Sequence, residues 1–329
     1  MRWKSQVRFG GRAGETHRAR ARQGAPVRPL QRVRVFAFVL RQKADFPVKT
    51  LCRVCRVSTS GYYDWVERDA AGPTVAEAAE ADLVERIRLV HAESRGRYGE
   101  PRVTEQLARD DVVVNHKRVE RLMARAGLRG RCGRRRMRTT IADPTKVPAA
   151  DLVKRQFNRD ELDQLWIGDA TYIATDEGWL FLATVIDACS RRLLGWSITD
   201  HLRTELCLDA LSAAVGTRGG KRNVAGVIFH SDHGTQYTSD AFGEACTDFA
   251  ITQSMGTVGD SYDNAMAESF FASFKREVVD GEHFATRAEA RAETFAWCVW
   301  YNTTRLHTSI GKRPPIEYEA HLNKQLLAA

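Results

Sequence analysis

The amino-acid sequence predicts an α/β fold, with a mixed five-stranded sheet flanked by helices and an all-α region of helix-turn-helix type before it. Three observations lead to this prediction. Apolar runs with strand character occur at about 164–174, 179–188 and 191–199, with turn-forming residues between them. Helical and strand patterns then alternate in the C-terminal third of the chain. Between about residues 45 and 126, apolar residues instead recur with the period of a helix.

Size and composition narrow the class of protein. A chain of 329 residues is long enough for two or three domains. It has no apolar run long enough to cross a membrane, and its basic N-terminus lacks the apolar segment of a secretory signal. Its seven scattered cysteines favour a reducing cytoplasm, and we interpret the lone C-x-x-C pair Cys52 and Cys55 as helix residues rather than zinc ligands. We therefore expect a cytoplasmic protein without a membrane partner.

Charge is distributed unevenly along the chain. The formal net charge is +9, from 50 Lys and Arg against 41 Asp and Glu. Residues 1–150 carry 33 basic and 16 acidic side chains, whereas residues 151–329 carry 17 basic and 25 acidic ones. A basic half joined to an acidic half indicates a region that grips a polyanion, attached to a core that can hold cations.

The chain begins with a basic arm, residues 1–35, that we expect to be disordered. Non-specific DNA binding and translation from an upstream start codon would each account for it. Residues 36–70 follow with the pattern of two short helices, and Ser58 is a suitable N-cap for the second. Two short helices joined by a tight turn form a helix-turn-helix candidate, although ordinary helical bundles contain such pairs too.

Residues 75–138 form a second helical region that is rich in arginine. Helices are expected at about 79–94, 101–110 and 115–126. The last helix carries basic residues outside its apolar face, and six arginines follow within residues 129–138. We interpret this concentration as DNA contact rather than a plain linker, because such a run repels itself unless phosphates or solvent compensate it. The residues expected to contact DNA are Arg118, Arg121, Arg134, Arg135 and Arg136. The proline-containing segment 139–162 is predicted to be an interdomain linker.

Residues 163–320 contain the predicted sheet and the C-terminal helices, together with three acidic residues in distinct settings. Asp169 lies within the first strand-like run, Asp232 follows an apolar strand, and Glu268 lies on a predicted helix. A buried carboxylate needs a cation or strong hydrogen bonds. Carboxylates from different elements can converge on hard divalent cations, and a pair of such ions can clamp both the attacking and the leaving oxygen of a phosphodiester. We therefore predict that these three residues are catalytic and bind metal.

Other polar residues near the predicted site allow several interpretations. Lys275 follows Glu268 by about two helical turns and is expected to meet a phosphate beside the metals. Arg305 and His307 follow the last predicted core helix and are expected to contact phosphate. A further group either lines a DNA channel or caps the helix of Glu268: Ser261, Tyr262 and Asn264.

Two alternatives concern the surroundings of Asp232 and the end of the second strand. His230 and His233 flank Asp232, which would suit a zinc hydrolase, but the sequence supplies no further histidine-rich ligand set. Asp187 follows the second strand-like run, and we interpret it as a residue that shapes the turn or supports the ligands rather than as a ligand itself.

Several motifs spread over residues 36–320 form a specific combination. They occupy Phe46–Val54, Ser60–Trp65, Tyr98–Arg102, Arg118–Met123, Asp169–Ile173, Asp187–Arg192 with Gly195 and Trp196, His230–Gly234, Asp263–Ala265 with Glu268, and Tyr301–His307. With these motifs the chain resembles the second-frame (orf B) transposases of the IS-three family of insertion sequences, whose catalytic core is similar to retroviral integrase. Ala170 departs from the pattern, because a larger aliphatic residue often follows the first Asp.

The resemblance implies an RNase H-like integrase core in which Asp169, Asp232 and Glu268 form the DDE triad. It implies two Mg²⁺ ions in each active site, for which Mn²⁺ is expected to substitute. The implied partners are DNA, both element ends and target, a first-frame transposase protein, and further copies of the chain on DNA. The implied location is the bacterial cytoplasm, at the nucleoid when bound to DNA.

The leading functional hypothesis is a DNA transposase that cleaves at element ends and transfers the 3′-OH into target DNA. A nuclease of the same fold that cuts without joining is a second hypothesis. A catalytically silent, transposase-derived DNA-binding regulator is a third, and the intact acidic triad argues against it.

Overall fold

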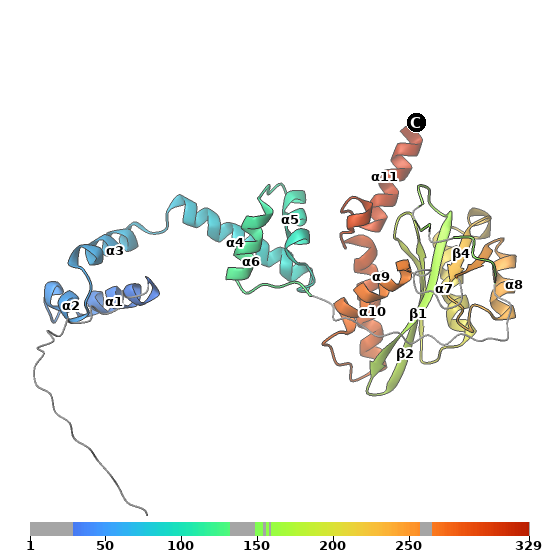
Figure 1. Ribbon diagram of the computed structural model, residues 1–329, viewed down its shortest axis with the longest axis horizontal. Coiled ribbons are helices and arrows are strands. Elements are labelled where there is room, and N and C mark those ends of the chain that lie inside the picture. Colours follow the sequence, from blue (N-terminus) through green and yellow to red (C-terminus); the bar gives the residue numbers. More distant parts are fainter. Residues whose placement is uncertain (1–28, 132–148, 154–155, 158, 257–264, 329) are drawn as a thin grey trace, which may run out of the picture. The chain divides into compact units, whose positions relative to one another are not determined.

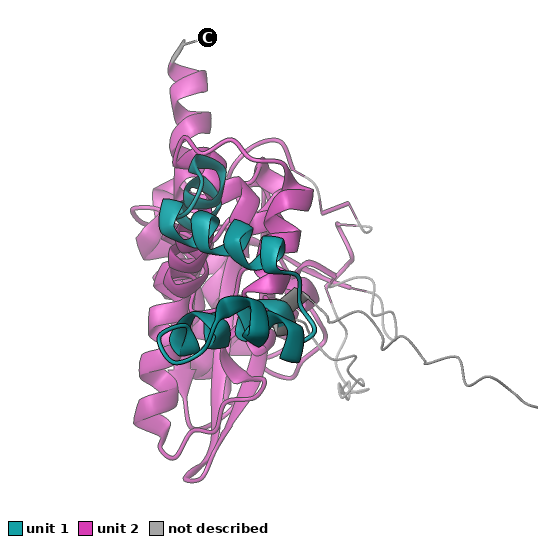
Figure 2. Cartoon of the chain, turned by 90° about the vertical axis from the view of Figure 1, so that its left-hand side faces the viewer, with its two compact units in different colours: residues 1–82 teal, residues 83–329 magenta. Residues whose placement is uncertain are grey.

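The structure is a computed structural model that describes residues 29–131, 149–153, 156–157, 159–256 and 265–328 (Figure 1). Residues 1–28 of the predicted basic arm lie outside these ranges. Six residues with predicted roles also lie outside them: Arg134, Arg135, Arg136, Ser261, Tyr262 and Asn264. The chain divides into two compact units, residues 1–82 and 83–329 (Figure 2). Of the helices that the structure describes, none has both the length and the apolar character needed to span a bilayer.

The first unit contains three short helices, α1 (Pro29–Gln42), α2 (Val48–Val54) and α3 (Thr59–Ala71). Its small core contains Cys52 and Tyr62, both almost fully buried. The predicted N-cap is confirmed, because the Ser58 hydroxyl accepts a hydrogen bond from the backbone N–H of Gly61 at 3.1 Å. Such a cap stabilises a helix by about 1 kcal/mol.

Helix α1 corrects one expectation. It begins inside the segment 1–35 that was expected to be disordered. Phe36 and Val39 give α1 a buried apolar face against α2 and α3, which makes ordering of this segment favourable. The exposed arginines Arg32 and Arg34 concealed that face in the sequence.

The second unit begins within α4 (Val75–Glu93) and continues with α5 (Glu100–Arg109) and α6 (His116–Arg125), close to the predicted bounds. Their shared core includes Ile87, Val103 and Val119, and it extends to Leu306 from the far end of the chain. The α4–α6 helices therefore pack against the segment that follows the last core helix.

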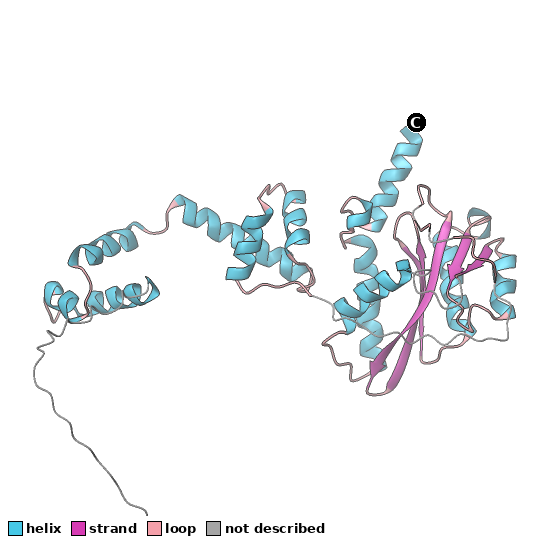
Figure 3. Cartoon of the chain, in the orientation of Figure 1, coloured by secondary structure: helices cyan, strands magenta, loops and turns pink. Residues whose placement is uncertain are grey.

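The sheet has five strands: β1 (Leu165–Thr175), β2 (Gly178–Asp187), β3 (Leu193–Thr199), β4 (Ile228–Ser231) and β5 (Thr252–Met255). Their order is β3-β2-β1-β4-β5. The pairs β1–β2 and β2–β3 are antiparallel, whereas β4 pairs in parallel with both β1 and β5 (Figure 3). The predicted mixed five-stranded sheet is therefore confirmed, with β1 at its centre. Strand β4 begins later than the apolar run before Asp232, because Val224 and Gly226 belong to the preceding loop, where Gly226 has φ +88°.

Helices cover both faces of the sheet. One face packs against α7 (Thr204–Thr217) and α8 (Asp240–Asp248). The other packs against α9 (Ala265–Phe274), which continues without a break into the π-helical segment η3 (Lys275–Val279), and against α10 (Arg287–Thr303). Two short helical turns complete the unit, η1 (Lys221–Asn223) before β4 and η4 (Thr308–Ile310) after α10. The last helix, α11 (Pro315–Ala328), continues past the predicted core boundary at residue 320.

One close contact packs a side chain of β4 directly on β1. Gly168 on β1 lies against the ring of Phe229 on β4, and a Cβ atom at position 168 would be only 2.1 Å from Phe229 Cζ. Trp166, two residues earlier, is paired with Phe229 in the ladder between these strands. The glycine therefore allows the aromatic ring to pack directly on the backbone of the central strand.

Candidate active site

The first predicted acid, Asp169, lies on the central strand β1. It faces the side of the sheet covered by α9 and α10, since Ile167 and Ile173, at even spacings from it, pack on that side. The side chain is half-buried, and its Oδ1 accepts a hydrogen bond from the backbone N–H of Ala170 at 2.7 Å. Its partner in the ladder between β1 and β2 is Thr184.

The second acid, Asp232, directly follows β4, the strand beside β1. Its Oδ1 accepts a hydrogen bond from the backbone N–H of Gly234 at 2.9 Å, which holds the tight turn after the strand. The two histidines that flank Asp232 contact neighbouring protein groups. His230 is buried with its Nδ1 3.0 Å from the Ser254 hydroxyl, and His233 Nε2 meets the carbonyl of Gly256.

The third acid, Glu268, is exposed in the first turn of α9, as the helical assignment predicted. Because α9 covers the sheet face onto which Asp169 projects, one helix and two neighbouring strands supply the three carboxylates.

The three acids act on one another electrostatically. Burial raises the pKa of Asp169 well above its usual value, and the negative charges of Asp232 and then Glu268 raise it further. The Ala170 N–H and the ammonium of Lys275 oppose this rise. Among the described residues, no three His, Cys, Asp or Glu side chains are close enough together to enclose a metal ion. The acids therefore form a repelling group rather than a closed cage, and oxygen ligands with surplus negative charge fit a hard divalent cation.

Lys275 lies at the start of η3, two helical turns after Glu268. Its Nζ lies 4.4 Å from the centroid of the Tyr172 ring on β1, and its charge reaches Asp169. The structure thus brings Lys275 to the acidic group, as its spacing from Glu268 predicted. Contact with phosphate stays a prediction.

Arg305 and His307, which we expected to contact phosphate, do not lie on the exposed surface. Both side chains are buried, with exposed fractions of 4% and 8%. Arg305 Nη2 is 2.9 Å from Oε1 of the buried Glu277, and its Nη1 donates toward the ring of His307. A buried, ion-paired arginine cannot lie along an external DNA backbone, so these residues do not form a surface contact.

Glu277 is the centre of this buried group, and sequence reasoning did not single it out. Its carboxylate accepts from Arg305 and from Trp297 Nε1 at 3.0 Å, and Arg102 Nη1 lies 3.7 Å away. The backbone carbonyl of Glu277 accepts from Arg97 at 3.2 Å. We call these five residues the Glu277 cluster. It joins α4–α6 to the helix that carries Glu268, and nothing local in the sequence signals it because its members lie far apart along the chain.

Asp187 has the turn-shaping role that we expected. It is fully buried at the end of β2. Its carboxylate accepts hydrogen bonds from the Ser190 N–H and hydroxyl at 2.7 and 2.8 Å, and from the Asp163 N–H at 2.9 Å. These bonds fix the β2–β3 turn.

Two of the arginines expected to contact DNA are described. Arg118 and Arg121 are exposed on α6, whose opposite face buries Val119 and Leu122. Their exposure is compatible with a nucleic-acid surface, but their DNA contact stays a prediction.

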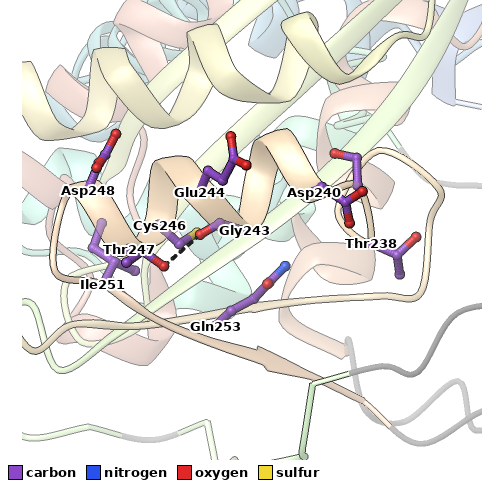
Figure 4. A pocket seen from close by; sticks show the side chains of 10 residues that line it. Thr238, Asp240, Gly243, Glu244, Cys246, Thr247, Asp248, Ile251 and Gln253 are labelled. Carbon is purple, nitrogen blue, oxygen red and sulfur yellow. Dashed lines mark hydrogen bonds between the residues drawn. The ribbon is translucent and has the colours of Figure 1, made fainter.

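The larger of the two best-formed cavities in the described chain is separate from the acids. It has a volume of about 610 Å³ and lies beside α8 and β5 (Figure 4). Its lining is acidic, with Asp240, Glu244 and Asp248, and Thr247 donates a hydrogen bond to the carbonyl of Gly243 there at 3.0 Å. None of the three predicted catalytic acids lines it.

Comparison with known families identifies the class of protein first. Residues 159–261 and 250–315 match two models that are both described as an integrase core domain, and residues 77–136 match an HTH-like domain. The class is thus a protein with an integrase core preceded by an HTH-like domain. The HTH-like match falls on α4–α6, and the helix-turn-helix interpretation of residues 36–70 stays a prediction.

Relatives narrow the identification. The chain is 39% identical over 267 residues to the putative transposase for insertion sequence element IS986/IS6110 of Mycobacterium tuberculosis (strain ATCC 25177 / H37Ra), which covers 80% of this chain and 95% of the relative. It is 36% identical over 293 residues to transposase InsF for insertion sequence IS3A of Escherichia coli (strain K12), which covers 88% of this chain and 99% of the relative. The chain belongs to the IS3 family of insertion-sequence transposases, which confirms the resemblance drawn from its motifs.

Among solved structures, the HTLV-2 integrase catalytic core domain in complex with magnesium (trimeric form) aligns with 15% identity and a TM-score of 0.38. The alignment covers 47% of this chain and 95% of that one.

Proposed function

We propose that the protein cleaves DNA at insertion-sequence ends and transfers the resulting 3′-OH into target DNA, with divalent cations as cofactors. One observation carries the proposal most directly. A central strand, the end of its neighbouring strand and a covering helix each supply one carboxylate. Burial raises the pKa of Asp169, and the charges of Asp232 and Glu268 raise it further. Uncompensated acids in a partly buried setting are typical of functional sites.

Asp169, Asp232 and Glu268 would hold the cations, which we propose to be two Mg²⁺ ions, replaceable by Mn²⁺. When bound, such a pair activates an attacking oxygen and stabilises a leaving one. The chain itself supplies position and charge. Its Ala170 and Gly234 backbone N–H groups orient the first two carboxylates, and no covalent protein intermediate is needed.

Lys275 is proposed to hold a phosphate of the reacting strand beside the acids. Its ammonium lies over the ring of Tyr172, and a cation–π contact holds the charge in a defined place beside the acids. A phosphate arriving at the acids would then meet a fixed positive charge.

The basic N-terminal half is proposed to bind the element ends. Arg118 and Arg121 on α6, with Arg134, Arg135 and Arg136 in the segment after it, would neutralise backbone phosphates. A first-frame protein encoded by the same element, and further copies of this chain on DNA, are proposed as partners. Bacterial cytoplasm, at the nucleoid, is the proposed location.

The test combines labelled element ends, a target plasmid and Mg²⁺ or Mn²⁺. The wild type should yield joined products, and Asp232→Asn should yield none because one acid of the proposed site is lost. Nicked ends without joined products would instead indicate a nuclease. A regulatory activity that survives Asp232→Asn, in a wild type that neither nicks nor joins, would indicate a catalytically silent DNA-binding protein.

A further inference from the structure

A second cavity lies beside the helix of Glu268. It has a volume of about 230 Å³ and is bordered by α9, by the β2–β3 turn and by the segment after α10. Exposed serines, Ser269 and Ser309, stand at its rim, whereas Arg305 and His307 lie buried on its floor. Among the described residues, no Asp or Glu lines it.

Arg191 in the β2–β3 turn is the distinctive residue of this cavity. Its backbone adopts φ +63°, a left-handed conformation that non-glycine residues rarely adopt. Its Nε atom is buried without a hydrogen-bond partner, and within the described residues its guanidinium forms no ion pair. Burial lowers the pKa of Arg191, because desolvation of this cation is incompletely compensated.

Arg218 shows how this chain treats a buried arginine that has a purely structural role. Its Nε lies 2.7 Å from Asp163 and its Nη2 2.8 Å from Glu319, so two carboxylates satisfy it. Arg191 is partly buried as Arg218 is, but within the described residues it has no carboxylate partner. The Nε atoms of Arg192, Arg276 and Arg287 are buried without a partner as well, but among these arginines Arg191 is the one that lines this cavity, where a ligand atom can satisfy it.

The floor of the cavity adds positive potential. Arg305 shares the single carboxylate of Glu277 with Arg102. Burial, followed by the charges of Arg305 and Arg102, lowers the pKa of His307 to about 2, so the ring is neutral at physiological pH. Three serine hydroxyls, from Ser269, Ser273 and Ser309, complete a lining that offers many donors.

The cavity is adjacent to the proposed catalytic group. Ser269 immediately follows Glu268, and on a helix of 3.6 residues per turn its side chain lies about 100° around the axis from that of Glu268. The volume is several times the roughly 30 Å³ that one water molecule occupies, which leaves room for a tetrahedral oxyanion.

We propose that this cavity binds a phosphate group, with Arg191 as its principal donor, and that in the DNA complex this group is a backbone phosphate of a strand passing Glu268. The assignment of DNA as the source rests on the proposed function. The binding of phosphate itself does not.

Two measurements test the proposal, each on the full chain. The first follows thermal unfolding in inorganic phosphate against chloride at equal ionic strength. Phosphate should raise the Tm of the wild type and of Arg191→Lys, but not of Arg191→Gln. Arg222→Gln is the matched control, because Arg222 is exposed on η1 outside the cavity, and it should respond as the wild type does.

The second measurement follows the affinity for element-end DNA as a function of salt. Loss of one phosphate contact should reduce the slope of log K against log salt by about 0.9 in Arg191→Gln, and leave it unchanged in Arg222→Gln. Ser309→Asp, a change at the exposed rim that leaves Arg191 in place, should reproduce both effects by repelling the anion even if Arg191→Gln does not fold.

Each outcome decides one part of the proposal. Phosphate stabilisation without a change in the DNA slope would mean that the cavity takes free phosphate and would overturn the DNA source. A wild type without a phosphate effect, together with an unchanged slope in both variants, would overturn the site. Asp232→Asn should keep the phosphate effect while losing strand joining, so failure of the proposed function is recognised separately.

Discussion

The helix formed by α9 and η3 carries two charged groups that differ in their electrostatic balance. Near its start, Glu268 adds its negative charge to those of Asp169 and Asp232, and the ammonium of Lys275 opposes them. Near its end, Glu277 is a single acid among several arginines, with every carboxylate oxygen hydrogen-bonded. The comparison teaches that a satisfied charge cluster holds elements together, whereas an unsatisfied one is prepared for a ligand.

The pKa shifts of the two groups point in opposite directions. The pKa of Asp169 is raised, first by burial and then by the other acids. The pKa of Glu277 is lowered, because the charge and hydrogen bonds of Arg305 and the bond from Trp297 outweigh the effect of its burial. Changes to the two groups should therefore affect different properties of the protein.

The largest expected effect is on activity. Glu268→Gln should reduce strand joining by more than the about 10–100-fold typical of losing a group that only orients a metal ligand. Its free energy of unfolding should stay close to that of the wild type, since Glu268 is exposed and its charge repels Asp169. Joining assays and urea denaturation on one preparation measure both. Substantial joining by Glu268→Gln would show that Glu268 is not required for activity, and the contrast between the acidic group and the Glu277 cluster would no longer hold.

The next effect is on stability. Glu277→Gln should lower the free energy of unfolding by about 3–5 kcal/mol, because it leaves the buried Arg305 without its counter-ion. Glu282→Gln is the matched control, since Glu282 pairs with Arg131 at 2.6 Å but is largely exposed, and it should cost at most about 1 kcal/mol. Equal losses in the two variants would show that burial of the cluster is energetically unimportant.

Magnesium should change the free energy of unfolding by an intermediate amount, and the change should depend on the acidic group and not on the Glu277 cluster. At about 100 times its dissociation constant, an ion that binds only the folded state adds about 2.7 kcal/mol of stability. We expect such a gain in the wild type and in Glu277→Gln, but not in Asp232→Asn. Urea denaturation with and without Mg²⁺ measures it, and a full gain in Asp232→Asn would remove that residue from the proposed cation site.

The smallest expected effects appear in the pH dependence of stability, at most about 1.4 kcal/mol per pH unit for one proton. Because the folded-state pKa of Asp169 is raised, the folded protein holds this proton more tightly, and stability is lost as pH rises from the usual aspartate range to the raised pKa. Because that of Glu277 is lowered, its contribution is lost as pH falls through the lowered value.

Single variants separate these two slopes. Asp169→Asn should flatten the loss at rising pH, and Glu277→Gln should flatten the loss at falling pH. Urea denaturation across a pH series would detect each change. A pH profile in Asp169→Asn that parallels the wild type would show that Asp169 does not titrate as an unsatisfied acid.

Local patterns predicted much of the architecture. The strands β1, β2 and β3, the Ser58 cap and the helical position of Glu268 depend on periodicity or turn chemistry within a few residues, which a sequence displays directly. The acidic triad stays a prediction, and it depends on the agreement of three sequence settings with their motifs.

The errors arose where distant residues decide the outcome. The sequence around Arg305 is the same whether its side chain is exposed or paired with Glu277. Folding brings Arg305 and Arg102 to the same carboxylate. Helix α1 was missed because its apolar face is short and is completed by residues from α2 and α3. The partner that buries a charge or a face is not encoded beside it.

The contact between Gly168 and Phe229 has a consequence for engineering. Gly168 precedes Asp169 and Phe229 lies three residues before Asp232, so the packing of this ring on the glycine lies next to both acids in the sequence. A methyl group at position 168 would displace the Phe229 ring from its place on β1 although it touches neither acid. The packing between the proposed ligands therefore depends on a residue that carries no side chain, and position 168 is a place where the two strands can be altered without changing either acid.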